Sequence, residues 1–238
     1  MRQDFVQLWV YLSATPLFGL TATLVGYCIA QAFYQRMNHA PWANPVLWSV
    51  LLLALLLTLS HTPYETYFSG AQFVHFLLGP AVVAMAWPLW QRRSELRSRA
   101  GAILLAALAG GSAAAASAYG IGWALGLPPD ILASLAPKSV TAPVAMGIAD
   151  KLGGIPALAA VFAVLTGLTG AISGKYLFDA LGIQSMQMRG FALGTCAHGI
   201  GAARAMQVHP DAGAYASLAL GVQVVLASLL MPLAFKLF

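Results

Sequence analysis

Long apolar segments, separated by short polar loops, occupy most of this chain. Only 8% of the residues are charged, whereas soluble domains carry roughly 25%. A hydrocarbon core of about 30 Å is crossed by roughly 20 helical residues. The pattern therefore predicts an all-α polytopic membrane protein with about 6–8 transmembrane helices. The apolar segments lie near 7–33, 45–60, 71–90, 100–122, 131–149, 154–177, 188–207 and 212–236.

No linker or change of composition divides the chain, so we expect one transmembrane domain over residues 1–238. Two N-terminal spans would occupy 1–60, and 64–238 would form the functional core. Four arginines (Arg92, Arg93, Arg97 and Arg99) are concentrated in the short loop Gln91–Arg99. Under the positive-inside rule this loop is cytoplasmic. The net charge of +5 is then a topology signal and does not indicate nucleic-acid binding.

The segment Ser134–Gly147 interrupts the apolar pattern with a lysine, three hydroxyl side chains and two prolines. Pro137 and Pro143 break the helical hydrogen-bond ladder, which leaves free backbone groups around Lys138, Ser139 and Thr141. Such a break is tolerated at membrane depth only inside protein or beside a wet cavity. An ionisable residue there indicates a functional site, here a polar pocket for a small anion. The alternative is a structural ion pair of Lys138 with Asp150 or with another buried acid.

A similar interruption occurs earlier in the chain, so we expect broken or re-entrant segments near 76–83 and 134–143. Leu78-Gly79-Pro80 matches Leu135-Ala136-Pro137 at an offset of 57 residues, and Tyr119 matches Tyr176 at the same offset. Paired interruptions of this kind point to internal structural repeats and to a binding site between them. Gly79 and Pro80 would then contribute backbone to the site.

A second polar cluster runs from Gly190 to Arg204. Glycines surround its histidine and permit close helix packing or an unwound backbone. His198 could carry a proton or contact a substrate, or it could simply bond a neighbouring carbonyl. Arg204 presents a planar fork suited to a carboxylate, or it could extend to a helix end. The residues that we expect to form this part of the site are Gly194, Thr195, His198, Gly199, Gly201 and Arg204.

Other chemistries have no support in the sequence. No Cys/His metal spacing, no phosphate-binding loop and no Gly-x-Ser-x-Gly elbow is present. We therefore expect no metal, no cofactor and no enzymatic activity. Cys28 and Cys196 lie in apolar segments far apart in sequence, which favours buried packing residues. Gln223, inside the last span, is a candidate for a hydrogen bond between helices.

The two polar clusters resemble the LrgB/CidB family, the larger partner of holin-like and antiholin-like pairs. Leu135–Ala145 resembles the family's Leu-x-Pro-Lys-Ser-Val-Thr-x-Pro-x-Ala run, and Gly194–Ala205 resembles its Gly-Thr-x-x-His-Gly-x-Gly run. Ala202 stands where the family has a threonine. The resemblance extends from about Tyr64 to the end of the chain, and the first 60 residues match only as apolar spans.

The resemblance implies transport of small monocarboxylates such as glycolate, glycerate or pyruvate, in a bacterial inner membrane. It also implies a homodimer and a small holin-like membrane partner of the LrgA/CidA type. The carboxylate would dock at Lys138 and at amides near Pro137 and Pro80, with Ser139, Thr141 and Thr195 bonding its other oxygen. Pro143 would serve as a hinge. The alternative is a holin-like or antiholin-like protein that regulates murein hydrolase export and lysis.

Overall fold

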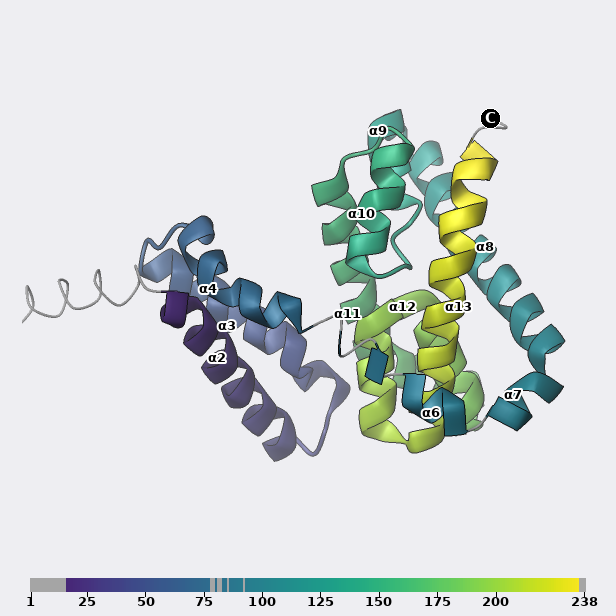
Figure 1. Ribbon diagram of the computed structural model, residues 1–238, viewed down its shortest axis with the longest axis horizontal. Coiled ribbons are helices and arrows are strands. Elements are labelled where there is room, and N and C mark those ends of the chain that lie inside the picture. Colours follow the sequence, from purple (N-terminus) through teal and green to yellow (C-terminus); the bar gives the residue numbers. More distant parts are fainter. Residues whose placement is uncertain (1–15, 78–79, 81–82, 85, 92, 236–238) are drawn as a thin grey trace, which may run out of the picture. The chain divides into compact units, whose positions relative to one another are not determined.

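The structure is a computed structural model that describes residues 16–77, 80, 83–84, 86–91 and 93–235. These described residues are helical or in turns and contain no strand, which confirms the all-α class. They fall into two compact units, residues 1–84 and residues 85–238. Among them, α2, α8, α11 and α13 are long and apolar enough to cross a membrane (Figure 1).

The first unit is built around α2 (Pro16–Arg36), which packs against α3 (Pro45–Leu59) and α4 (Tyr64–Phe76). A short turn of 3₁₀ helix, η1 (Pro41–Ala43), precedes α3. The side chain of Asn44 accepts hydrogen bonds from the amides of Val46 and Leu47 and so caps α3. The Tyr67 hydroxyl bonds the Thr23 hydroxyl at 2.8 Å, which joins α4 to α2. The start of the predicted 7–33 span lies outside the described residues.

The predicted span 71–90 is not one helix. α4 ends at Phe76, and the next helices whose bounds the structure gives are the short helices α6 (Ala86–Gln91) and α7 (Arg93–Ser98). Pro80 lies between α4 and α6 and is exposed. The predicted backbone residue Gly79 lies outside the part of the chain that the structure describes.

The second unit contains three long helices: α8 (Ala100–Ala124), α11 (Pro156–Ala180) and α13 (Pro210–Phe235). They agree with the predicted spans 100–122, 154–177 and 212–236. Two contacts show that α8 and α13 run in the same direction. Gln223 bonds the Ala107 carbonyl, and 12 residues further along each helix Phe235 packs edge-to-face on Tyr119. The first of these contacts confirms that Gln223 forms a hydrogen bond between helices.

The predicted span 131–149 is broken into α9 (Pro129–Leu135) and α10 (Ala142–Lys151), as the prolines indicated. At roughly 10 and 15 Å, neither helix crosses a hydrocarbon core. The short loop from Leu152 to Ile155 joins α10 to α11, so α10 runs back alongside that helix. The Ser134 hydroxyl accepts from the Ile155 amide, which ties α9 to the same end of α11. Residues 136–141 are therefore the tip of a segment that doubles back.

The predicted span 188–207 is also wrong as a crossing helix. α12 (Met186–Val208) contains a turn at His198, where φ is 40° and ψ is −134°. A Cβ built on Gly201 would lie 2.6 Å from the Leu193 carbonyl oxygen, although residues eight apart in a straight helix are separated by about 12 Å. The half 199–208 therefore folds back along the half 186–197. Each half is roughly 15–18 Å long, too short to cross alone.

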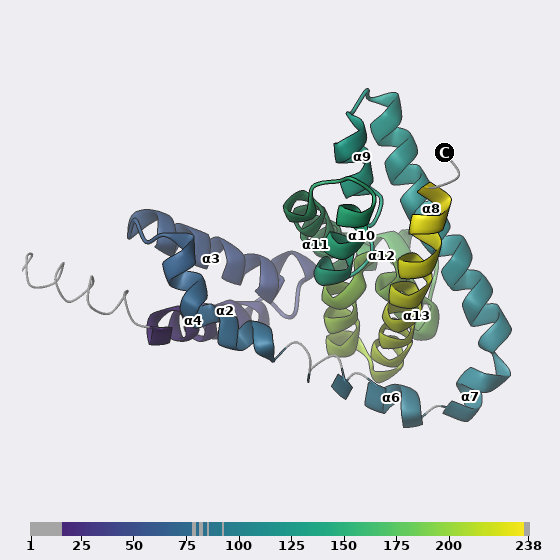
Figure 2. The same cartoon turned by 45° about the horizontal axis from the view of Figure 1, so that its top comes forward.

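The two doubled-back segments approach α11 from opposite ends. α9 and α10 lie at its N-terminal end, whereas α12 starts at its C-terminal end, where α6 and α7 also lie (Figure 2). An interrupted segment followed by a long helix thus occurs twice, as α9–α10 then α11 and as α12 then α13. This pairing differs from the predicted repeat, which matched 76–83 with 134–143 and whose first member lies partly outside the described residues.

Glycines allow the close packing of α12 on α13. A Cβ at Gly190 would overlap the Ala212 carbonyl, and one at Gly194 would overlap the Ala216 carbonyl. The surrounding cluster consists of Ala202, Ala205, Ala212 and Ala216. Within a membrane, helices cannot associate by burying apolar surface from water, so close van der Waals packing has to hold them together. Small side chains allow the helix backbones to approach closely enough for that packing.

Candidate functional site

The break between α9 and α10 places its polar residues in different surroundings. Pro137 is fully buried, and Ser139 is 7% exposed. The Ser139 hydroxyl has no hydrogen-bond partner among the described residues. Thr141 precedes α10 but does not cap it with its side chain, and Pro143 in the first turn is exposed. A buried hydroxyl without a partner is unfavourable.

Lys138 is half-buried at the tip of this break. Its ammonium group makes no ion pair or hydrogen bond with any described residue. Asp150, the candidate partner for a structural ion pair, is exposed. The expected alternative to a functional lysine, an internal ion pair with Asp150, is therefore not formed.

The turn of α12 is held by the His198 side chain, which is 4% exposed. Its Nε2 lies 2.7 Å from the Ala163 carbonyl oxygen in α11. A carbonyl only accepts, so Nε2 carries the hydrogen. Gly167 leaves room for the ring, because a Cβ there would lie 2.9 Å from ring atoms of His198.

α10 and the His198 turn meet the same stretch of α11. Ala163 belongs to the buried alanine cluster that joins α10 to α11 through Ala145, Ala149 and Ala159. The same residue accepts the His198 hydrogen bond from the other side. The interruptions at 136–141 and at His198 are 57 or more residues apart in sequence. Tertiary packing therefore brings the two predicted clusters together.

A polar groove of about 330 Å³ lies along α11 between these two tips. Lys138 and Cys196 line it from the two interrupted segments, and Thr166, Thr169 and Ser173 line it from α11. The Thr169 hydroxyl donates to the Leu165 carbonyl at 2.8 Å, and the Ser173 hydroxyl donates to the Thr169 carbonyl at 2.6 Å. Because both hydroxyl hydrogens are donated to backbone carbonyls, each oxygen can only accept a further hydrogen bond. The groove combines one cation with hydroxyl acceptors.

Several predicted residues lie outside this groove. Thr195 is buried, with its hydroxyl bonded to the Phe191 carbonyl at 2.9 Å and its methyl group close to Gly110 of α8. Arg204 is 7% exposed within α12, so it does not extend to solvent. Pro80 belongs to the other unit. Gly194 packs on α13, whereas Gly199 and Gly201 follow the turn.

Four lining residues were not expected from the sequence: Thr166, Thr169, Ser173 and Cys196. The hydroxyls have a signal, since 166, 169 and 173 recur at helical spacing on one face of an apolar span. Cys196 was expected to be a buried packing residue, but it is exposed in the groove. Cys28 is exposed as well. No group of His, Cys, Asp or Glu side chains in the described residues could hold a metal.

A second cavity, of about 470 Å³, lies between α8 and α13. Its walls are mainly alanine, glycine and leucine, with Gln223 and Ser112 as polar exceptions. Ala136 from the break closes one side of this cavity, whereas Lys138 lines the polar groove. The tip of the break thus separates an apolar cavity from a polar one.

Comparison with known proteins places the chain in a family. A model of the LrgB-like family matches residues 23–237. An uncharacterized protein of Haemophilus influenzae is 31% identical over 237 residues, which is 100% of this chain and 98% of the relative. The uncharacterized protein YxaC of Bacillus subtilis is 34% identical over 216 residues, 91% of this chain and 94% of the relative.

Relatives with a descriptive name are also similar over nearly their full length. The holin-like protein CidB of Staphylococcus epidermidis is 28% identical over 228 residues, 96% of this chain and 98% of that protein. No solved structure matches the chain.

Proposed function

This chain belongs to the LrgB-like family, and we propose that it carries small monocarboxylates across a bacterial inner membrane. The substrate class is a two- or three-carbon acid such as glycolate, glycerate or pyruvate. Transport would proceed by alternating access, with the groove along α11 as the binding site. A homodimer, and a small holin-like partner of the LrgA/CidA type, belong to the same proposal.

The observation that carries the proposal is the ammonium group of Lys138. It lines a polar groove at a broken helix and has no partner among the described residues. A charged side chain inside a membrane protein is costly and is retained for a reason, often a substrate or ion. A carboxylate would neutralise this charge through a charge-assisted hydrogen bond.

The surrounding groups fit the rest of a small acid. The N-terminal end of α10 favours negative charge through its helix dipole, and the Ser139 hydroxyl lies just before that helix, although Ser139 is not among the residues that line the groove. Across the groove, Thr169 and Ser173 present oxygen acceptors that suit a substrate hydroxyl group. A groove of about 330 Å³ is at the small end of ligand sites, which agrees with a substrate of few atoms.

The two folded-back segments supply the moving parts of the proposed mechanism. α10 and the His198 turn both pack on α11 at Ala163, so a shift of either segment changes one wall of the groove. Substrate sites of secondary transporters typically lie where interrupted helices from two repeats meet. His198 acts in this scheme by holding the α12 turn, since its ring bonds the Ala163 carbonyl.

The names of the relatives favour a second function more directly than they favour carriage. Similar proteins over nearly the whole chain are named holin-like protein CidB. On that basis this chain would assemble in the membrane, alter its permeability and regulate murein hydrolase export. The long apolar helix α8, which is mostly exposed within its unit, offers a surface for such assembly.

Uptake of radiolabelled glycolate, lactate and pyruvate into proteoliposomes tests the proposal. A carrier gives saturable uptake, and Lys138→Gln lowers it about tenfold or more, as expected for a lost charged hydrogen bond. Lys151→Gln, at an exposed lysine at the end of α10, is the matched control and leaves uptake unchanged. Leakage of unrelated solutes without saturation, in the wild type and in the Lys138 variant alike, would support the holin-like function instead.

A further inference from the structure

The short helices α6 and α7 present a surface of tryptophan and arginine side chains at one end of the second unit. Trp87 and Trp90 are 63% and 62% exposed. Arg93, Arg97 and Arg99 are exposed beside them. We call these five side chains the α6–α7 surface.

The α6–α7 surface has a defined local structure. The Arg93 guanidinium lies 4.8 Å from the centre of the Trp90 ring, and its Nη1 donates to the Trp90 carbonyl at 3.1 Å. α6 packs against α13, and α7 packs against α8. Arg99 donates to the Gln187 side chain at 3.5 Å, which joins the start of α8 to the start of α12. These contacts hold the surface against the helices that cross the membrane.

Its position along the membrane normal follows from the chain. Arg99 immediately precedes α8, whose 25 residues are apolar enough to span a bilayer. The guanidinium groups therefore lie where the hydrocarbon core ends and the headgroups begin. Exposed tryptophans are also enriched at this level, since their rings are apolar with one polar edge.

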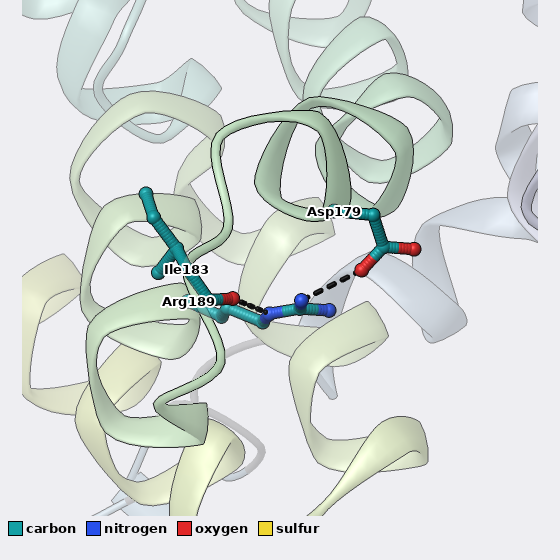
Figure 3. Close-up of polar contacts among 3 residues, drawn as sticks. All are labelled: Asp179, Ile183 and Arg189. Carbon is teal, nitrogen blue, oxygen red and sulfur yellow. Dashed lines mark hydrogen bonds and ion pairs between the residues drawn. The ribbon is translucent and has the colours of Figure 1, made fainter.

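Charge differs between the two ends of this unit. The end with the α6–α7 surface also holds the basic residues Lys175 and Arg189 and the acidic residues Glu95, Asp179 and Asp211, so basic side chains are in excess there. Arg189 is already neutralised, because its Nη2 lies 2.6 Å from Asp179 and its Nε donates to the Ile183 carbonyl (Figure 3). The opposite end carries Asp130, Asp150 and Lys151. The basic end is the cytoplasmic one by the positive-inside rule, and anionic lipids are concentrated in that leaflet.

We infer that the α6–α7 surface binds the headgroups of anionic phospholipids. The arginines contact the lipid phosphate through charge-assisted hydrogen bonds, and the tryptophan rings insert between the headgroups. Arg97 is exposed and bonds no described residue, so its guanidinium is available to a phosphate. The site is separate from the polar groove and does not rest on the proposed transport.

Native mass spectrometry of the detergent-purified chain, titrated with phosphatidylglycerol or phosphatidylcholine, tests this inference. Phosphatidylglycerol is expected to bind more tightly, and raising the salt concentration weakens it by screening. Each arginine contributes about fivefold in affinity at an anionic surface. Arg97→Gln should therefore weaken phosphatidylglycerol binding about fivefold, and the variant with Gln at 93, 97 and 99 by roughly 100-fold.

Matched controls separate a local headgroup site from a general effect of charge. Lys151→Gln removes a charge from the opposite end and should leave lipid binding unchanged. Arg97→Gln breaks no described contact, so it remains informative even if the triple variant fails to fold. Inorganic phosphate at the same concentrations should not displace the lipid, which distinguishes a headgroup site from a site for free phosphate. Equal binding of the two lipids, or unchanged binding by Arg97→Gln, would overturn the inference.

Discussion

The turn at His198 makes an unusual stability prediction, because the best replacement there is glycine. In an ordinary helix interior glycine is about 1 kcal/mol less stable than alanine. His198 has φ 40° and ψ −134°, a conformation that disfavours any residue with a Cβ. Backbone strain of this kind amounts to about 1–3 kcal/mol. Alanine at position 198 keeps the strain, whereas glycine removes it.

The expected magnitudes follow from these two effects. His198→Ala and His198→Gly both lose the buried hydrogen bond to Ala163, about 0.5–1.5 kcal/mol, and the same imidazole ring. The difference between the free energies of unfolding of the two variants therefore reports only the backbone contribution at position 198. Relief of about 1–3 kcal/mol of strain against a glycine penalty of about 1 kcal/mol leaves the glycine variant equal to the alanine variant or up to about 2 kcal/mol more stable.

The assay is equilibrium unfolding in mixed dodecylmaltoside and SDS micelles, followed by tryptophan fluorescence. Ala203 is exposed in the second half of α12, and Ala203→Gly provides the matched control. That substitution should destabilise by about 1 kcal/mol, as in a regular helix. If glycine is also the worse residue at 198 by a similar amount, the backbone there is not strained and the turn is wrong.

A distance measurement checks the same turn independently. Spin labels at Met188 and Val208, both exposed, would lie about 30 Å apart in a continuous helix. Because α12 doubles back, the distribution should be centred well below that distance. A distribution centred near the length of a straight helix would contradict the fold of α12 that the site depends on.

Three further predictions concern packing, a loop contact and the groove. Gly194→Ala should destabilise the protein by about 1–3 kcal/mol through overpacking, because the new Cβ would overlap a backbone carbonyl. Gly221→Ala is the control, since open space surrounds Gly221 and the substitution should be tolerated. The melting temperatures of both variants check this prediction. A double-mutant cycle of Arg189→Gln and Asp179→Asn should give a coupling of about 1 kcal/mol, since the Asp179 side chain is 49% exposed although that of Arg189 is 13% exposed, and a coupling of several kcal/mol would show that the pair behaves as a buried one. Thr169→Val removes a groove acceptor, so it should raise KM for lactate uptake more than for pyruvate uptake, and an equal rise would exclude a contact with the substrate hydroxyl.

The interrupted helix at 136–141 could be predicted, whereas the turn at His198 could not. Proline lacks an amide hydrogen and clashes within a helix, so Pro137 signals a break in any fold. Position 198 carries a histidine, although the next residue, Gly199, is the type that a left-handed turn prefers. Only packing against Gly167 and the bond to Ala163 make the turn at 198 favourable.

The candidate site shows the same division. Lys138 stands out in the sequence because a charge in an apolar segment is costly. Thr169 and Ser173 share one helix face with Thr166, but this signal is weak, since hydroxyls in apolar helices commonly bond the carbonyl four residues earlier, as both do here. Thr195 and Arg204 were expected near the substrate, but the fold of α12 directs Thr195 toward α8 and buries Arg204 outside the groove.

The amino-acid order alone determines that this chain lies in a membrane and that its apolar segment near 136–141 is interrupted. Both properties are local, because they follow from the transfer of side chains into hydrocarbon and from the covalent structure of proline. The tertiary structure decides that α9–α10 and α12 fold back instead of crossing, and that Lys138 shares a groove with Cys196 and the hydroxyls of α11. Those outcomes depend on contacts between residues far apart in sequence, where glycine and alanine surfaces determine which helices can approach.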